Sequence, residues 1–262
     1  MEKITELLEA KNRNEPISVI TCYDYSSAKI VEKSNVDAIL VGDSVAMVIH
    51  GFENTINATV EMIETHVKAV RKGTKKLIIA DLPFLAQQKG EKFFFSSVDK
   101  MLKAGANSIK IEGTAGATLN SIKLSTSLGI PIVGHLGLTP QSIQKLGGYK
   151  IQGKVSHEAE TMLQDAKLLE DVGCSAIVLE LVPSDLAEEI TNNLSIPTIG
   201  IGAGNSTSGQ VLVMQDLLGM DKNFNPKFLK KYLNASSLFT EAFNKYSKEV
   251  KQKEFPSDKE SY

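Results

Sequence analysis

Short apolar runs rich in valine and isoleucine alternate along the chain with longer segments that mix apolar and polar residues. The runs lack the strict alternation of a half-exposed strand, which predicts strands buried on both faces, as in a parallel sheet covered by helices. Eight such runs can be identified, the last of them weaker than the others, at residues 17–24, 38–43, 77–83, 108–113, 131–137, 176–183, 197–204 and 210–214.

The segments between the runs have the periodicity of amphipathic helices. Between Thr59, a suitable N-cap, and Gly73, a suitable stop, apolar residues recur on one helical face at Val60, Ile63, Val67 and Val70. Strands interleaved with helices predict an α/β fold, a single-domain (β/α)8 TIM barrel, although the link between the last two strands is too short for a helix.

The barrel is expected to occupy the whole chain, residues 1–262, with a helical extension at its start and a tail at its end. The extension covers residues 1–16 and the last helical region residues 226–253. Residues 254–262 lack core-forming side chains, so they are predicted to be a disordered tail.

Composition narrows the class of protein. A length of 262 residues suits one such barrel. With 29 basic and 31 acidic residues, the charge balance gives no basis for binding nucleic acid or a membrane. No apolar run reaches the roughly 20 residues that span a bilayer, so a cytoplasmic location is expected. Cys22 and Cys174 lie far apart in apolar segments, which favours buried thiols over a disulfide.

Charged and polar residues follow the apolar runs, where parallel strands of a barrel bring their carboxyl ends to one rim. A single acid there is as often the cap of the next helix as a functional group. Several converging carboxylates instead repel one another unless a cation offsets the charge, and oxygen ligands favour Mg²⁺. The residues at these run ends are Tyr23, Asp24, Asp43, Ser44, Asp81, Lys110, Glu112, His135 and Glu180.

Three of these residues have specific candidate roles. Lys110 lies two residues before Glu112, so both face the same side of a strand, and its ammonium could orient an anionic substrate or simply pair with an acid. His135 could contact a substrate oxygen or be a satisfied core histidine. Glu180, if it is not a metal ligand, is the natural general base.

Three further features have less specific interpretations. The segment 138–155 is longer than a routine link from strand to helix and is a candidate binding loop. The glycines of IGIGAGN could cradle a phosphate, although tight packing explains them equally well. The other histidines are expected in a loop or on helices, exposed to solvent, at positions 50, 66 and 157.

An ordered set of motifs is similar to that of the ketopantoate hydroxymethyltransferase family, from about residue 17 to 232. The strings are TCYDYS, LVGDS, HVKAVRKG, ADLPF, IKIEG, GHLGLTPQS, GGYKIQG, LELVP and IGIGAGN. The resemblance implies a barrel of the phosphoenolpyruvate mutase and isocitrate lyase kind. It also implies transfer of the one-carbon unit of 5,10-methylenetetrahydrofolate to 3-methyl-2-oxobutanoate, giving ketopantoate, the first committed step of pantothenate synthesis.

The resemblance also implies roles for individual residues. Asp43 and Asp81 match the Mg²⁺ ligands, with Glu112 as the third acid near the metal, and Glu180 matches the proton acceptor. The substrate contacts are matched by Asp43, Ser44, Asp81, Lys110 and His135. The family further implies one Mg²⁺ per subunit and a homodecamer built as a pentamer of dimers.

Two alternatives remain open from the sequence. One is another metal-dependent 2-oxo-acid carbon–carbon lyase or mutase on the same barrel, which would keep the metal acids. The other is a barrel that binds a metabolite without turnover, which would not need an acid such as Glu180 apart from the metal.

Overall fold

The apolar runs form the strands of a closed parallel barrel in the computed structural model, which describes residues 2–142, 148 and 150–262. Within these residues each strand pairs with the next along the chain, and the first pairs with the last. The predicted barrel is therefore confirmed. Its strands are β1 Ile17–Thr21, β2 Ala38–Val41, β3 Leu77–Asp81, β4 Ser108–Glu112, β5 Ile132–Gly137, β6 Ala176–Glu180, β7 Thr198–Ile201 and β8 Gly209–Leu212.

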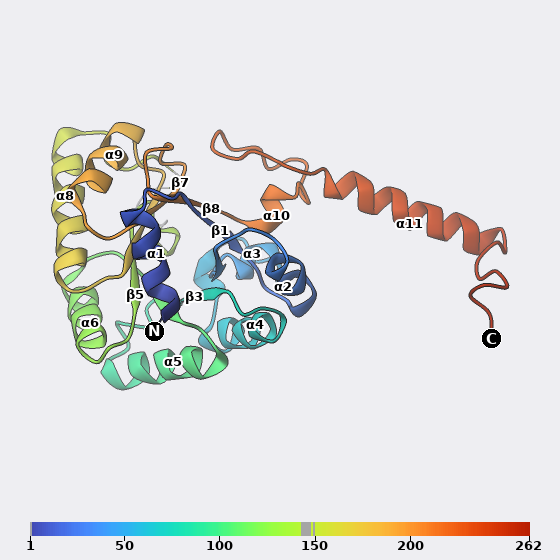
Figure 1. Ribbon diagram of the computed structural model, residues 1–262, viewed down its shortest axis with the longest axis horizontal. Coiled ribbons are helices and arrows are strands. Elements are labelled where there is room, and N and C mark those ends of the chain that lie inside the picture. Colours follow the sequence, from blue (N-terminus) through green and yellow to red (C-terminus); the bar gives the residue numbers. More distant parts are fainter. Residues whose placement is uncertain (1, 143–147, 149) are drawn as a thin grey trace. The chain divides into compact units, whose positions relative to one another are not determined.

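Helices follow the first six strands and cover the outside of the barrel (Figure 1). Residues 202–208, between β7 and β8, contain no helix, as the length of this link predicts. The helical elements are α1 Glu2–Asn12, α2 Tyr25–Glu32, α3 Val45–Val48, η1 Thr55–Asn57, α4 Val60–Gly73, α5 Glu91–Ala104, α6 Gly116–Ser127, η2 Pro140–Ser142, α8 Ser156–Asp171, α9 Ser184–Asn193, α10 Met214–Leu217 and α11 Ala235–Lys251.

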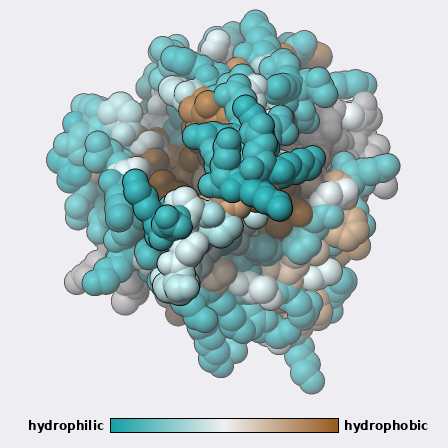
Figure 2. Space-filling model, turned by 90° about the vertical axis from the view of Figure 1, so that its right-hand side faces the viewer, coloured by the Kyte–Doolittle hydropathy of each residue, from teal (hydrophilic) through white to brown (hydrophobic). Residues whose placement is uncertain are grey.

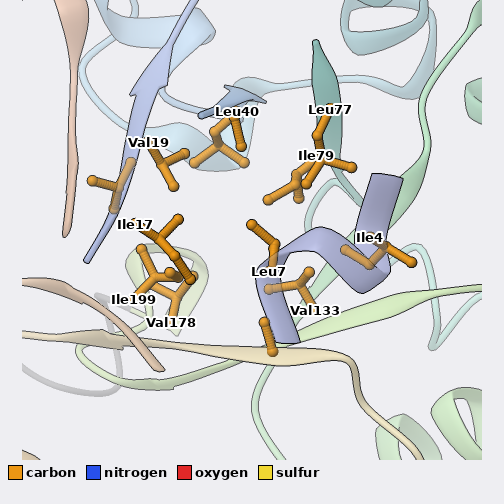
Figure 3. Close-up of a cluster of buried hydrophobic side chains, with 13 residues drawn as sticks. Ile4, Leu7, Ile17, Val19, Leu40, Leu77, Ile79, Val133, Val178 and Ile199 are labelled. Carbon is orange, nitrogen blue, oxygen red and sulfur yellow. The ribbon is translucent and has the colours of Figure 1, made fainter. Parts of the chain in front are cut away.

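The inside of the barrel is apolar at the amino ends of the strands, and α1 closes this end. Ile4 and Leu7 of α1 lie among inward side chains of the strands, which include Leu40, Ile79 and Val178 (Figure 3). This cluster excludes water because its side chains are aliphatic and almost fully buried. The apolar plug leaves the opposite rim as the place where polar side chains can gather.

Helix α4 begins and ends where the sequence indicates. The Thr59 side chain accepts a hydrogen bond from the Met62 backbone N–H at 3.1 Å, which confirms the predicted N-cap. The helix ends at Gly73, where a Cβ atom would lie 2.6 Å from the carbonyl oxygen of Tyr25. Glycine is thus required there by the close approach of the segment that opens α2.

The glycines of IGIGAGN serve close packing. A Cβ at Gly200 would lie 2.7 Å from the Thr207 hydroxyl, and one at Gly204 would lie 2.6 Å from the Ser184 Cβ. These distances are shorter than van der Waals contact, so side chains are excluded by neighbouring atoms. Of the two readings of this segment, the structure favours packing over a phosphate cradle.

Contacts divide the chain into a barrel unit, Met1–Val213, and a C-terminal unit, Met214–Tyr262. Within the second unit the prediction of one helical region over 226–253 is wrong, because α11 begins only at Ala235. The preceding backbone pairs instead with the end of α10, where the Tyr232 N–H donates to the Leu217 carbonyl oxygen at 2.8 Å. Residues 254–262 form turns and bends only, and their disorder stays a prediction.

Two predictions from composition can be compared with the described residues. Cys22 and Cys174 are free and buried, as expected. No described helix is long and apolar enough to cross a membrane, and the cytoplasmic location stays a prediction. The face seen in Figure 2 is mainly hydrophilic, with hydrophobic patches between the polar side chains.

Glu170, at the end of α8, fastens the segment that leads into β7, and this contact should depend on pH. Its carboxylate accepts hydrogen bonds from the backbone N–H and the hydroxyl of Ser195, both at 2.6 Å. Burial alone would raise the pKa of Glu170, but the hydrogen bonds from Lys167, Ser195 and Ile196 lower it to about 2. The ionised form is therefore favoured by folding.

We predict that Glu170→Gln lowers the free energy of unfolding by about 1–2 kcal/mol at pH 7. A depressed pKa contributes stability above the unfolded value of 4.5, and this contribution is lost as the pH falls toward about 2. The difference between wild type and variant in urea unfolding should shrink across this window. The exposed Glu158→Gln on α8 is the control, and a difference that stays constant with pH would contradict the account.

Candidate active site

The inward positions change from apolar to charged along the same strands. Side chains alternate between the two faces of a strand, so the next inward side chain after Ile79 on β3 is Asp81. In the same way, the next inward side chain after Val133 on β5 is His135. On β6, Val178 is followed by Glu180. The residues predicted from the strand ends therefore lie at the carboxyl-terminal rim of the barrel, where active sites of this fold form.

An ion pair joins two of these strand ends. Asp81 and Lys110 are register partners on β3 and β4, and the Lys110 Nζ lies 2.8 Å from Asp81 Oδ1 with both side chains buried. Burial alone would lower the pKa of Lys110, but Asp81, Glu112 and Asp43 together raise it, so the ammonium form is retained. The other oxygen of Asp81, Oδ2, accepts a hydrogen bond from the backbone N–H of Asp43 at 2.9 Å.

Asp43 lies just after β2, close to Asp81 and Glu112. Burial, followed by the charges of Asp81 and Glu112, raises the pKa of Asp43 well above its ordinary value. Lys110 offsets only part of this effect. Repulsion between these carboxylates is therefore only partly compensated by Lys110, which favours binding of a proton or a further cation.

His135 on β5 lies between two carboxylates. Its Nδ1 is 3.5 Å from Glu112 Oε1, and its Nε2 is 3.4 Å from Glu180 Oε2. Burial and the Lys110 ammonium, whose Nζ is 3.4 Å from Nδ1, lower the pKa of His135, but the two carboxylates outweigh them and raise it. His135 thus connects Glu180 to the rest of the cluster, and Glu180 is the most exposed of these acids, at 18% of its side chain.

Gln141 is a site residue that the sequence did not reveal. Its side-chain amide donates to Asp43 Oδ2 at 2.9 Å and to the Leu82 carbonyl oxygen at 3.0 Å. Its backbone N–H donates to Glu112 Oε2 at 3.1 Å. Gln141 therefore holds two acids from different strands. It follows β5 in the predicted binding loop 138–155, of which residues 143–147 and 149 lie outside the described residues.

Tyr23 and Asp24, at the end of β1, have different roles. The Tyr23 hydroxyl lies 2.6 Å from the Ser44 Oγ, and its side chain is only 1% exposed, so it borders the site. The carboxylate of Asp24 instead accepts from the backbone N–H of Ser27 at 2.8 Å and caps α2. For Asp24 the alternative of a helix cap is therefore correct.

The acids expected to bind a metal converge, but each is held by protein groups. Among the described residues, no group of three or more His, Cys, Asp or Glu side chains is arranged to hold a metal ion. The hydrogen bonding of Glu112 is nevertheless incomplete, because its buried Oε1 lies 3.5 Å from His135 Nδ1 and has no hydrogen-bond partner among the described residues. Carboxylate oxygens are the ligands that Mg²⁺ prefers, so the chemistry of Asp43, Asp81 and Glu112 suits this ion although their arrangement here is not that of a metal site.

Comparison with known proteins identifies the family. The ketopantoate hydroxymethyltransferase profile matches residues 2–258. This chain belongs to that family. Its relatives include the 3-methyl-2-oxobutanoate hydroxymethyltransferase of Legionella pneumophila (strain Lens), 52% identical over 261 residues, which are 99% of this chain and 100% of the relative. The enzyme of the same name from Coxiella burnetii (strain CbuK_Q154) is 52% identical over 94% of this chain and 93% of the relative.

Solved structures support the fold assignment. A 2,3-dimethylmalate lyase of the phosphoenolpyruvate mutase and isocitrate lyase superfamily aligns with a TM-score of 0.61 over 99% of this chain and 92% of that structure. At 15% identity this likeness concerns the fold alone. The ketopantoate hydroxymethyltransferase family membership confirms the enzyme class that the motifs predict, a hydroxymethyltransferase.

Proposed function

We propose that this chain transfers the one-carbon unit of 5,10-methylenetetrahydrofolate to C3 of 3-methyl-2-oxobutanoate, giving ketopantoate. The observation that carries the mechanism is the position of Glu180. Its carboxylate is directed at His135 rather than at the crowded acids Asp43 and Asp81, and it is partly open to solvent. A carboxylate of this kind is free to accept a proton from a bound substrate.

We place Mg²⁺, one per subunit, at Asp43 and Asp81, with Glu112 as the third acid near it. Two observations support this assignment: the neighbouring carboxylates raise the pKa of Asp43, and Glu112 Oε1 accepts no hydrogen bond from the described residues. When bound, the ion draws electron density from the substrate carbonyl and so makes the neighbouring C3 proton more acidic.

The remaining residues bind and orient the 2-oxo acid. Lys110, a buried ammonium at the rim, balances the substrate carboxylate, while Ser44 and His135 contact its oxygens. Glu180, directly or through a water, accepts the C3 proton, and C3 then forms its new bond to the methylene carbon of the folate. The two bonds from this carbon to the folate nitrogens break, one water molecule supplies the hydroxyl oxygen of ketopantoate, and tetrahydrofolate leaves with the C3 proton and the remaining hydrogen of that water. Because the walls of the site are buried, these charges act in a low dielectric and orient the substrate strongly.

The closest alternative is another 2-oxo-acid lyase or mutase on the same barrel. It would share the metal acids, so product analysis is needed to separate the two. Folate-dependent formation of ketopantoate supports the proposal, whereas cleavage or rearrangement of a different 2-oxo acid supports the alternative. A barrel without catalytic activity would bind 3-methyl-2-oxobutanoate and form no product.

Glu180→Gln should bind 3-methyl-2-oxobutanoate but exchange its C3 proton for deuterium at least about 100-fold more slowly, because the amide cannot act as a base. NMR in D₂O without folate measures this exchange, and titration calorimetry measures binding. Glu188→Gln, on the exterior helix α9, is the matched control. Exchange at the wild-type rate in Glu180→Gln would exclude Glu180 as the proton acceptor.

Removal of divalent metal should abolish product formation, and Mg²⁺ should restore it. A second readout does not depend on activity: because a ligand of the native state stabilises it, saturating Mg²⁺ should raise the Tm of the metal-free protein. Asp43→Asn should lose this increase, and Asp99→Asn on the surface of α5 should keep it. A Tm that does not respond to Mg²⁺ in the wild type would contradict this metal site.

We further propose the homodecamer implied by the family. Support comes from α11, where apolar side chains form a stripe along one face and are exposed. Phe243, for example, is 68% exposed. The stripe consists of Phe239, Phe243, Tyr246 and Val250. Exposed apolar side chains arranged in this way favour contact with another copy of the chain.

Light scattering coupled to size exclusion should give the wild type the mass of ten 28.5-kDa chains. Phe243→Glu should give smaller species, because burying a carboxylate in an apolar interface is costly. Asn244→Glu, on the polar side of the same helix, should leave the mass unchanged. A monomeric wild type, or equal masses for the wild type and Phe243→Glu, would refute this role of the stripe.

A further inference from the structure

Two histidines outside the cluster of charged residues at the rim are hydrogen-bonded to each other. His66 lies on α4 and is half-buried, although the sequence suggested a solvated surface position, and His50 follows α3 and is exposed. Their Nε2 atoms are 3.0 Å apart. The Nδ1 of His66 lies 2.6 Å from the carbonyl oxygen of Tyr23, so both nitrogens of this ring are engaged.

The chemistry of these contacts fixes the proton positions for neutral rings. A carbonyl oxygen only accepts, so the Nδ1 of His66 carries a hydrogen and donates to Tyr23. The Nε2 of neutral His66 then has a lone pair, and the Nε2 of His50 must be the donor. The order of donation is therefore His50 to His66 to Tyr23.

Together with a contact of Ser44, these hydrogen bonds connect both ends of α3 to Tyr23. The Tyr23 hydroxyl lies 2.6 Å from the Ser44 Oγ, which precedes the first residue of α3. The Ser44 hydroxyl makes no capping bond to the helix. At the other end, His50 follows the helix and is hydrogen-bonded to His66, which is hydrogen-bonded in turn to the carbonyl oxygen of Tyr23. Both ends of this short helix are thus tied to the same residue, Tyr23.

We propose that His50 and His66 form a positioning pair that holds Asp43 and Ser44 in place for the 2-oxo acid. A helix of four residues has little stability of its own, so contacts at its ends determine where it lies. Asp43 and Ser44 immediately precede this helix. The inference deepens the proposed function, since it rests on these two residues binding the substrate, and neither histidine touches the reacting atoms.

Substitutions can remove the His50–His66 hydrogen bond and the hydrogen bond from His66 to Tyr23 separately. His66→Asn retains a short N–H donor for the Tyr23 carbonyl but does not reach His50, whereas His66→Ala loses both contacts. His50→Ala loses the donor to His66, and His50→Gln retains one. His50 is exposed, so its variants should fold, and thermal unfolding followed by circular dichroism checks this for every variant. The exposed His157→Ala on α8 is the matched control.

The pair should affect binding of the 2-oxo acid more than turnover. At saturating Mg²⁺ we expect His66→Ala to raise the KM for 3-methyl-2-oxobutanoate about tenfold, because it removes two hydrogen bonds of modest net strength. His50→Ala should raise it about threefold, with His50→Gln near the wild type. The kcat and the KM for the folate should change less than twofold. Calorimetric titration with 3-methyl-2-oxobutanoate should show the same order of affinities.

A double variant provides a test that a general loss of stability would not pass. His50→Ala and His66→Asn remove the same bond, so their combination should raise the KM no more than the larger single change. Additive effects, an unchanged KM in both single variants, or equal losses in kcat and in both KM values would each overturn the inference. A wild type that makes no ketopantoate would instead refute the proposed function, and calorimetry would still test the pair.

Discussion

The arrangement of the rim depends on the repulsion between like charges that are buried close together. A closed parallel barrel directs the last inward side chain of each strand to one rim, and here four of those positions or their neighbours are acids, Asp43, Asp81, Glu112 and Glu180. Lys110 and His135 are placed where they reduce the repulsion. Burial and the charges of Asp81 and Glu112 still raise the pKa of Asp43 well above its ordinary value, and such repulsion favours binding of a proton or a cation.

The rest of the barrel maintains this arrangement. At the opposite end, α1 fills the interior with aliphatic side chains, so this end of the barrel is apolar. Hydrogen bonds from uncharged donors then fix the positions of the acids. Gln141 binds Asp43 and Glu112 without adding charge, and the backbone N–H of Asp43 binds Asp81. The site is therefore organised before any ligand binds, which is what electrostatic catalysis requires.

The barrel fold of this protein does not by itself specify the reaction. The barrel is shared with lyases and mutases at 15% identity or less, so architecture alone does not separate hydroxymethyl transfer from carbon–carbon cleavage. The separation comes from the family match over residues 2–258. The short helix α3 is anchored to Tyr23, and the same contacts link His50 and His66 to this helix.

The sequence by itself determined the strands, their parallel order and the charged residues at their ends, because buried strands need continuous apolar runs and a barrel places every strand end at one rim. Only the tertiary structure decided which groups meet. Gln141 and Asp43 are 98 residues apart, and His66 reaches the Tyr23 carbonyl across 43 residues. Asp24 resembles the other strand-end acids yet caps a helix. Such pairings depend on side-chain direction and on the packing of neighbouring loops, which no local pattern of residues records.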